Sequence, residues 1–311
     1  MENLISLLEA SNWKDYALLD SGDGLKLERF GKYVFVRPES QAMWKRSLDA
    51  EWKKADAVFI STGEESGGHW DFKRKVEERW EMRYNLTPRP PLLKGEGALK
   101  FWAMTTPGRH LGVFPEVASH WDWCVNLIKH EGHKGHEVKV LNLFGYTGLA
   151  TLAAASAGAK VTHVDASKKS VSWARGNQEL SGLGAAPIRW IVDDALKFVQ
   201  REGRRGVKYD GIILDPPKFG RGPKGEVWEV YKSLPNLLEA CRACLSENPL
   251  FVVTTIYAVR ASAIHVAQAM DDMMKGFGGK VESGELVTRE QSAGRLLSQA
   301  VFARWEKSPS P

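Results

Sequence analysis

The segment from Val140 to Ser167, VLNLFGYTGLATLAAASAGAKVTHVDAS, constrains the fold more than any other part of the chain. An apolar run is followed by a loop with two glycines, an alanine-rich stretch and a second apolar run that ends in an acid. These features predict a strand, a turn, a helix and a second strand, which together form a βαβ unit. In such a unit, the loop after the first strand typically holds a nucleotide-like cofactor.

The alternation of strands and helices continues to the end of the chain. Strands are predicted at 138–144, 160–165, 188–192, 209–214, 250–257, 280–289 and 296–305, and helices at 148–157, 168–181, 194–202, 227–246 and 261–275. This alternation favours a mainly parallel sheet. No helix separates the last two strands, so they should pair antiparallel as a hairpin at one sheet edge. The pattern predicts an α/β, Rossmann-like sheet of seven strands with a terminal antiparallel hairpin, which is the class I methyltransferase fold.

The first part of the chain has a different pattern. We expect a small, mainly β but mixed α+β N-terminal domain at 1–108, with a possible role in substrate recognition, and a catalytic domain at 109–311. Predicted elements of the first domain are an antiparallel meander at 16–37, a helix at 38–60 with Trp44, Leu48 and Trp52 on one face, a loop at 61–72, and strands within 78–85 and 99–114. A helix should begin near Pro115, which suits a first helical turn.

The glycine loop indicates the type of cofactor. Gly145 and Gly148 allow a tight turn and close approach of a ligand, and the helix that starts near Gly148 offers unpaired N–H groups to a carboxylate or phosphate. A dinucleotide site would need G-x-G-x-x-G, which is absent. Tyr146 and Thr147 crowd the place of a pyrophosphate, so the smaller methionine part of S-adenosylmethionine fits better.

Acids follow three of the predicted strands. Asp165 ends the second strand and suits ribose hydroxyls, whereas Asp194 follows the third and could accept from an adenine amino group. An acid at either place could instead be a helix N-cap. Asp215 ends the fourth strand and precedes Pro216 and Pro217, which fix the backbone and leave carbonyls for a ligand. The order and spacing of the three acids favour one shared ligand site.

These motifs resemble a known family. LNLFGYTGLATLAAASAGA, VTHVDASKKSVSWARGNQELSGL and DPPKFG are similar to the bacterial large-subunit ribosomal RNA methyltransferases, which depend on S-adenosylmethionine and include the 23S rRNA cytosine-C5 enzyme. The resemblance covers roughly 110–305. It implies a ribosomal RNA substrate and S-adenosylmethionine as cofactor. The implied cofactor contacts are Asn142, Leu143, Phe144, Gly145, Tyr146, Thr147, Gly148, Asp165, Ala166, Asp193, Asp194 and Ala195, and the implied methyl-transfer residues are Asp215, Pro216, Pro217, Lys218 and Phe219.

One departure from that family bears on the chemistry. Its cytosine-C5 members carry a catalytic cysteine at the end of the fifth strand, because a thiolate must first add to carbon 6 of the base. The corresponding segment here, LFVVTTIYAVRAS, has no cysteine. Cys124, Cys241 and Cys244 are expected on helices away from that strand end. We therefore expect methylation of a base by another route.

The sequence is compatible with several other functions. The acceptor could be a protein or a small molecule, the chain could be a dinucleotide-dependent dehydrogenase, or it could bind the cofactor without catalysis. Phe219 or Tyr257 could support a flipped base. Lys218, Arg221 and Lys224 could contact RNA phosphates, although Lys218 could equally be a solvated loop residue.

The composition indicates which partners and which cellular compartment to expect. The formal charge of +5 permits a polyanionic partner without requiring one. Three cysteines favour a reducing, cytoplasmic compartment, and neither a leader peptide nor an apolar run of roughly 20 residues is evident. No metal site is expected, because the C-x-x-C pair at 241–244 lacks partners and His130, His133 and His136 lie in a glycine-rich connection.

Overall fold

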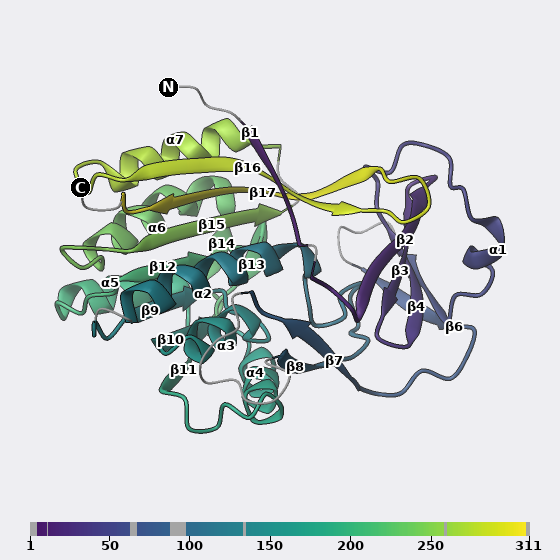
Figure 1. The fold of residues 1–311 in the computed structure, drawn as a ribbon, viewed down its shortest axis with the longest axis horizontal. Coiled ribbons are helices and arrows are strands. Elements are labelled where there is room, and N and C mark those ends of the chain that lie inside the picture. The colour runs from purple at the N-terminus through teal and green to yellow at the C-terminus, as the bar shows by residue number, and fades with distance from the viewer. Residues whose placement is uncertain are drawn as a thin grey trace.

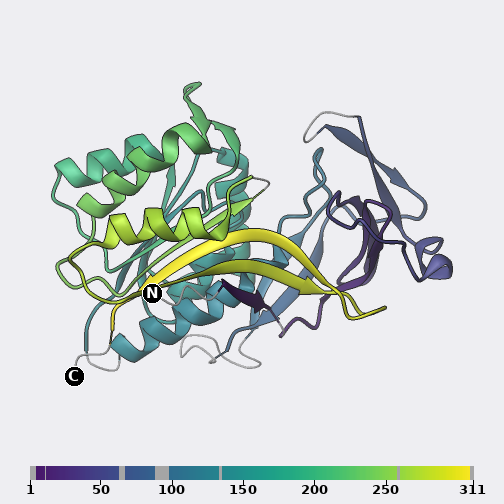
Figure 2. The same ribbon diagram turned by 90° about the horizontal axis from the view of Figure 1, so that it is seen from above.

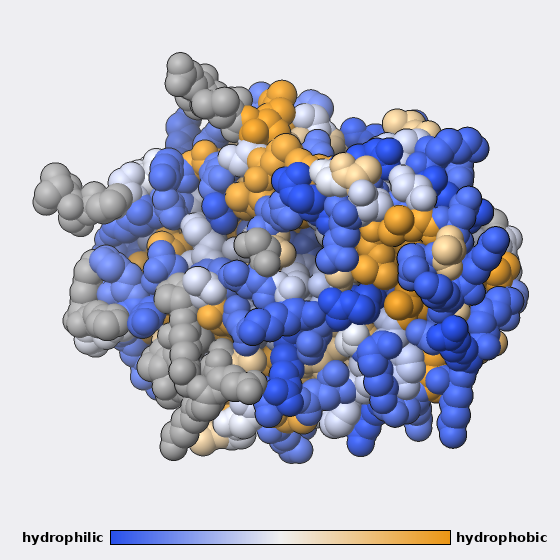
Figure 3. Space-filling view, turned by 45° about the vertical axis from the view of Figure 1, so that its right-hand side comes forward, coloured by the Kyte–Doolittle hydropathy of each residue, from blue (hydrophilic) through white to orange (hydrophobic). Residues whose placement is uncertain are grey.

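The computed structural model describes residues 5–10, 12–62, 67–87, 98–132, 135–257 and 260–308. A large sheet with helices on both faces forms one part of the molecule, and a smaller β unit lies beside it (Figure 1). Among the described residues, no helix is long and apolar enough to cross a membrane. Hydrophilic side chains cover most of the face seen in Figure 3, with small apolar patches between them.

The large sheet confirms all seven predicted strands. Its order is β1-β16-β17-β15-β12-β9-β10-β11. The predicted strands are β9 (Lys139–Leu143), β10 (Lys160–Asp165), β11 (Ile188–Val192), β12 (Gly211–Leu214), β15 (Phe251–Tyr257), β16 (Lys280–Arg289) and β17 (Leu296–Glu306). Strands β15, β12, β9, β10 and β11 run parallel, and β17 is antiparallel to both β15 and β16. The terminal hairpin is therefore confirmed.

An eighth strand was not expected. β1 (Ile5–Glu9) pairs parallel with β16 outside the hairpin. The close approach is possible because Gly284 has no side chain: a Cβ there would lie 1.8 Å from the Ser6 carbonyl oxygen. The start of the chain thus belongs to the large sheet.

The helices pack in two layers. One face is covered by α2 (Ala118–Gly132), α3 (Leu149–Ser156) and α4 (Lys168–Leu180). The 3-10 turn η1 (Pro115–Val117) leads directly into α2. The other face is covered by α5 (Ala195–Arg204), α6 (Val230–Ala243) and α7 (Ala263–Met274). Figure 2 shows the two layers on opposite sides of the sheet. Small alanine side chains of α3 let it lie close against β9 and β10 and complete the buried core.

The predicted helix 227–246 begins three residues late. Residues 219–229 instead form a hairpin of β13 (Phe219–Arg221) and β14 (Val227–Glu229). α6 then starts at Val230. The hairpin follows directly on the Asp-Pro-Pro segment.

The N-terminal unit confirms the meander and corrects two other predictions. β2 (Tyr16–Gly22), β3 (Leu25–Phe30) and β4 (Tyr33–Pro38) are antiparallel neighbours. The sheet is completed by β5 (Ala57–Ser61) and β6 (Gly68–Phe72), and β7 (Trp80–Asn85) pairs with β8 (Ala98–Ala103). The loop predicted at 61–72 was thus wrong where β6 forms.

The helix predicted at 38–60 was also wrong, since only α1 (Asp49–Trp52) is helical there. The carboxylate of Asp20 accepts hydrogen bonds from the backbone of Ser47 and Leu48 and from the Trp52 indole, each at 2.8 Å. These tertiary bonds hold the segment against the sheet in an irregular conformation. They outweigh the helical spacing of its apolar residues.

The long β16–β17 hairpin joins the two parts of the molecule and reaches over the N-terminal unit (Figure 2). Lys26 donates to Gln299 at 2.8 Å and Ser292 donates to Asp20 at 2.6 Å. Glu28 is buried and forms bonds of 2.7 and 2.8 Å with Arg37. The first two contacts join the N-terminal unit to the β16–β17 hairpin, whereas the Glu28–Arg37 pair holds β3 and β4 together within the unit.

Candidate functional site

The candidate site lies where the parallel strands end. Leu143 pairs with Val164 on one side and with Leu214 on the other, so the loops after β9, β10 and β12 share one edge of the sheet. Backbone bonds join these loops: Gly145 N–H donates to the Val164 carbonyl at 3.1 Å, and Asp193 N–H to the Asp165 carbonyl at 3.1 Å. The sheet therefore brings the glycine loop and the predicted acids to the same edge.

The glycine loop has an unusual backbone. Phe144 and Tyr146 have φ angles of 58° and 48°, and Gly148 has a φ of 83°. The first two are left-handed values at non-glycine residues, which surrounding contacts must hold. A Cβ on Gly148 would also lie 2.7 Å from that of Ala174. Among the described residues, no side chain caps α3, so its first N–H groups face the loop.

Gly145 has a different role from the one expected. Its φ is ordinary, but a Cβ there would lie 2.4 Å from the imidazole of His163. His163 is fully buried beneath the loop and contacts the Thr151 hydroxyl at 2.9 Å, and Asn142 donates to the same hydroxyl at 2.9 Å. The glycine leaves room for this buried polar network, which supports the loop from below. His163 was not predicted to be a site residue.

The acids after β10 and β11 have backbone partners. Asp165 accepts from the N–H of Tyr146 at 2.9 Å and of Ser167 at 2.8 Å, while burial raises its pKa. Asp194 caps α5 by accepting from the Lys197 N–H at 2.9 Å. Asp193 is bound by Arg201. Asp194 is therefore a helix N-cap, which was one of the two roles expected for it. Its remaining lone pairs are still available to a ligand.

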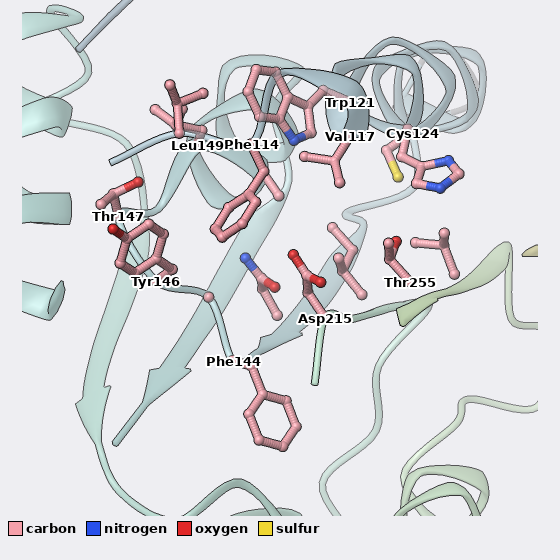
Figure 4. A pocket seen from close by; sticks show the side chains of 17 residues that line it. Phe114, Val117, Trp121, Cys124, Phe144, Tyr146, Thr147, Leu149, Asp215 and Thr255 are labelled. Carbon is pink, nitrogen blue, oxygen red and sulfur yellow. The ribbon is translucent and has the colours of Figure 1, made fainter. Parts of the chain in front are cut away.

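Asp215 reaches into a cavity between the loop and α2. Six of the predicted site residues line it: Asn142, Phe144, Gly145, Tyr146, Thr147 and Asp215. Figure 4 shows the Asp215 carboxylate pointing toward Phe114, whereas the Phe144 ring points away. The remaining predicted residues do not line this cavity: Leu143, Gly148, Asp165, Ala166, Asp193, Asp194, Ala195, Pro216, Pro217, Lys218 and Phe219.

The electrostatics of Asp215 are distinctive. Its Oδ1 atom is buried and has no hydrogen-bond partner among the described residues. Burial, reinforced by the negative charge of Glu116, raises the pKa of this carboxyl to about 8. Glu116 follows Pro115 at the start of the predicted helix, a position that suggested interaction with the helix dipole rather than a role in the site. A buried carboxyl without a partner is poised to accept a ligand hydrogen bond.

Aromatic side chains surround this corner. Phe114 lies 5.1 Å from the Tyr257 ring and 5.8 Å from the Tyr146 ring, measured between centroids. Burial raises the pKa of the Tyr257 hydroxyl well above its usual value, and the charges of Asp215 and Glu116 act in the same direction. The corner is therefore apolar and rich in rings, and the carboxyl groups of Asp215 and Glu116 are its acidic groups.

The Asp-Pro-Pro segment is held by Trp228, which was not predicted to be a site residue. Trp228 on β14 is buried and donates its indole N–H to the Pro217 carbonyl at 2.6 Å. Its ring lies 4.9 Å from that of Phe144. This indole contacts both the glycine loop and the loop after β12. The Pro217 carbonyl therefore already accepts a hydrogen bond from within the protein. The Lys218 ammonium group lies over the Phe219 ring, 5.2 Å from its centroid.

The position expected for one cysteine was wrong. Cys241 and Cys244 are buried around α6, away from the cavity, but Cys124 on α2 lines it together with Asp215 and Thr255 (Figure 4). A helix before the sheet can fold back over the strand ends, which its place in the sequence did not reveal. Burial raises the pKa of the Cys124 thiol, so it is a poor nucleophile in this setting.

His130 and His136 do not line the cavity. His130 contacts Glu131 at 3.5 Å and His136 contacts Asp210 at 3.2 Å, whereas His133 lies outside the described residues. Within the described ranges, no three His, Cys, Asp or Glu side chains converge to hold a metal ion.

Parts of this chain are similar in sequence to known proteins. The family model "Conserved hypothetical protein 95" matches residues 121–253. The chain is 31% identical over 179 residues to Ribosomal RNA large subunit methyltransferase I of Aeromonas salmonicida, which covers 57% of this chain and 41% of that protein. It is 25% identical over 231 residues to Ribosomal RNA large subunit methyltransferase K of Neisseria meningitidis serogroup B, covering 73% and 61%. The chain thus spans about two to three fifths of the length of these curated relatives.

Solved structures are similar over nearly the whole chain. The SAM-dependent methyltransferase from Agrobacterium tumefaciens aligns with a TM-score of 0.88 and 48% identity, covering 97% of this chain and 94% of that one. A putative SAM-dependent methyltransferase from Streptococcus mutans aligns with a TM-score of 0.65 and 18% identity, covering 95% and 76%. The second likeness concerns the fold alone. Together they confirm the predicted fold class.

Proposed function

The chain belongs to the S-adenosylmethionine-dependent methyltransferases, and we propose that it transfers a methyl group to a base of ribosomal RNA. The two curated relatives named as ribosomal RNA methyltransferases support this substrate. The formal charge of +5 supports a polyanionic partner. A cytoplasmic location is part of the proposal, because both reactants are found there.

One observation carries the proposal. The Asp215 carboxylate, with its buried and unpartnered Oδ1 atom, lines the same cavity as the glycine-loop residues Gly145, Tyr146 and Thr147. A methyl donor held by the loop and an acceptor held by Asp215 would therefore meet inside a single cavity. This is the arrangement that a two-substrate transfer needs.

The residues present fit the cofactor. We propose that the open N-terminus of α3 receives the methionine carboxylate, because its N–H groups lack a side-chain cap. Asp165 at the end of β10 has lone pairs left for ribose hydroxyls, and residues 193–195 border the adenine. The ring of Tyr146 narrows the site, which suits a single adenosine better than a dinucleotide.

The chemistry follows from this arrangement. S-adenosylmethionine supplies a methyl group activated on a sulfonium. In the proposal, Asp215 and the Pro216 carbonyl accept hydrogens from an exocyclic amino group and thereby orient its lone pair toward the methyl carbon. The apolar walls of Phe114 and Val117 exclude water from the cavity. Alignment rather than covalent catalysis supplies the rate acceleration.

A transfer assay tests the substrate. The protein is incubated with methyl-labelled S-adenosylmethionine and ribosomal RNA from cells lacking the gene, and the RNA nucleosides are identified by mass spectrometry. Label in one methylated nucleoside is expected. Label only in protein or in small molecules would contradict the RNA substrate.

Replacing Cys124 tests the route of methylation. We expect Cys124→Ala to keep kcat within about threefold of the wild type, because the buried thiol forms little thiolate. Cys241→Ala is the matched control, since Cys241 is equally buried but lies away from the cavity. Steady-state kinetics on ribosomal RNA measure both. A loss of 100-fold or more in folded Cys124→Ala alone, on the order of a missing nucleophile, would contradict the proposed route.

The raised pKa of Asp215 makes folding stability depend on pH. Its folded value of about 8 lies above that of an unfolded aspartate, so between about pH 4 and 8 the unfolded state releases the proton first. The wild type should therefore lose stability relative to Asp215→Asn as the pH rises through this window. Thermal unfolding of the ligand-free proteins should show the gap in Tm widening by on the order of 5 °C between pH 5 and 8. A constant gap would show that the carboxyl ionises normally.

A further inference from the structure

The β13–β14 hairpin presents one face to the core and the other to solvent. In its register Phe219 pairs with Glu229, Gly220 with Trp228, and Arg221 with Val227. Directly paired residues share a face, and neighbours along a strand alternate. Trp228 is buried, so Phe219, Arg221, Val227 and Glu229 lie on the outer face, called here the hairpin face.

The hairpin face exposes apolar side chains that a solvated turn would not need. Phe219 is 53% exposed and Val227 is 73% exposed. Tyr231, which follows β14, is also 53% exposed. Its hydroxyl accepts from the Arg260 N–H at 2.7 Å, which holds the ring in place. Two exposed rings near the candidate site form stacking surfaces for bases.

The charges on the hairpin favour an anionic partner. Arg221 and Lys224 form no ion pair among the described residues. The two acids of the hairpin are neutralised: Glu226 pairs with Lys197 at 2.7 Å and Glu229 with Lys232 at 2.6 Å. Residues 1–108 contain equal numbers of acidic and basic residues, so the formal charge of +5 comes entirely from residues 109–311.

The hairpin is fixed relative to the site. Trp228 bonds the Pro217 carbonyl and lies against Phe144, and the Val230 N–H donates to the Lys218 carbonyl at 3.0 Å. The hairpin stands out from the body of the molecule at the top of Figure 2. Its outer face is thus a rigid projection that begins four residues after Asp215.

We infer that the hairpin face, with Tyr231 and Lys224, is the surface on which single-stranded RNA docks. The inference rests on the proposed function. Exposed rings stack on unpaired bases, and Arg221 and Lys224 neutralise phosphates beside them. An apolar protein partner would not require unpaired cations among the rings, and the N-terminal unit has no excess of positive charge to attract RNA.

RNA binding by matched variants tests this surface. The probe is a fluorescent, mixed-sequence single-stranded RNA of about 15 nucleotides, measured by anisotropy over a range of KCl concentrations. We expect Phe219→Ala to weaken binding about tenfold, the loss of one stacked base. Arg221→Ala with Lys224→Ala should weaken it at least as much and reduce the slope of log K against log salt by about 1.4.

The control variant is Lys53→Ala with Lys75→Ala, two exposed lysines of the N-terminal unit. It should bind RNA as the wild type does. Calorimetry with S-adenosylhomocysteine should give the same affinity for the wild type, the Arg221/Lys224 variant and the control, which shows that the fold is intact.

Three results would overturn the inference: no binding of the RNA by the wild type, wild-type affinity in both hairpin variants, or equal losses in the control. Anionic lipid vesicles are tested in parallel. If the hairpin variants bind RNA as the wild type does, which is the second of these results, but no longer bind the vesicles, the partner of this surface is a membrane. Failure of the proposed function is a separate result, namely no label transferred to ribosomal RNA by the wild type.

Discussion

Asp215→Ala is expected to lower kcat for methyl transfer by about 100-fold or more while leaving the affinity for S-adenosylhomocysteine within about fivefold of the wild type. The carboxyl group follows directly on β12, and its buried Oδ1 atom, which has no partner among the described residues, belongs to a side chain that lines the cavity. In the proposed reaction it orients the acceptor and contacts the cofactor little. Its removal should therefore affect the rate rather than cofactor binding. Steady-state kinetics and calorimetry measure the two effects separately.

Two companion variants make this result interpretable. Asp215→Asn keeps the shape but replaces an acceptor oxygen by a donor, so it should be nearly as slow as Asp215→Ala. Asp271→Ala removes an exposed acid from α7 and should behave as the wild type. Full activity in folded Asp215→Ala would remove Asp215 from the reaction.

Trp228→Ala is expected to lower kcat by about 50-fold or more with the KM for S-adenosylmethionine changed by less than about threefold. The indole joins the Pro217 carbonyl to the Phe144 ring, so its loss releases the Asp-Pro-Pro corner from the glycine loop. A displacement of about 1 Å between reacting groups can cost about 100-fold in rate. Trp228→Phe keeps one ring but loses the hydrogen bond and part of the packing surface, so an intermediate loss of about tenfold is expected.

Because Trp228 is buried, its variants also lose stability, and a matched control separates the two effects. Trp305 is buried as well and donates its indole N–H to a backbone carbonyl, that of Gly278, at 2.8 Å. It lies away from the cavity. Trp305→Phe should lower Tm to a similar extent as Trp228→Phe but leave kcat unchanged. Equal losses of kcat in both would assign Trp228 a structural role only.

The catalytic part of the fold was predictable because its signals are local. Each buried parallel strand is a short apolar run, and each helix starts near a recognisable residue such as Ser167 or Asp194, both of which cap helices in the structure. The missing helix between β16 and β17 correctly indicated the antiparallel hairpin.

The errors in the fold arose where distant residues decide local structure. The segment 39–48 has helical spacing, but the buried Asp20 carboxylate binds its backbone and holds it in an irregular conformation. β1 forms only because β16 offers an open edge with a glycine at the contact. Neither Asp20 nor Gly284 is near these segments in the sequence.

The site was predicted in outline because its main residues also have local sequence signals. The glycine loop and Asp215 follow strands that the pattern identifies, and parallel strands bring their ends together. Glu116, Cys124 and Trp228 were not identified as site residues. Cys124 lines the cavity from a helix that folds back, the charge of Glu116 acts on Asp215, and Trp228 holds the Pro217 carbonyl from a hairpin that resembles a helix in sequence. Gly145 illustrates the limit of motif reasoning, since the side chain that requires a glycine there is His163.

A crystal structure with S-adenosylhomocysteine tests the central claim most directly. The account predicts the adenosine between Asp165 and Asp194, the amino-acid end at the start of α3, and the sulfur facing the Asp215 carboxylate. A ligand bound at another edge of the sheet, or with its sulfur turned away from Asp215, would contradict it.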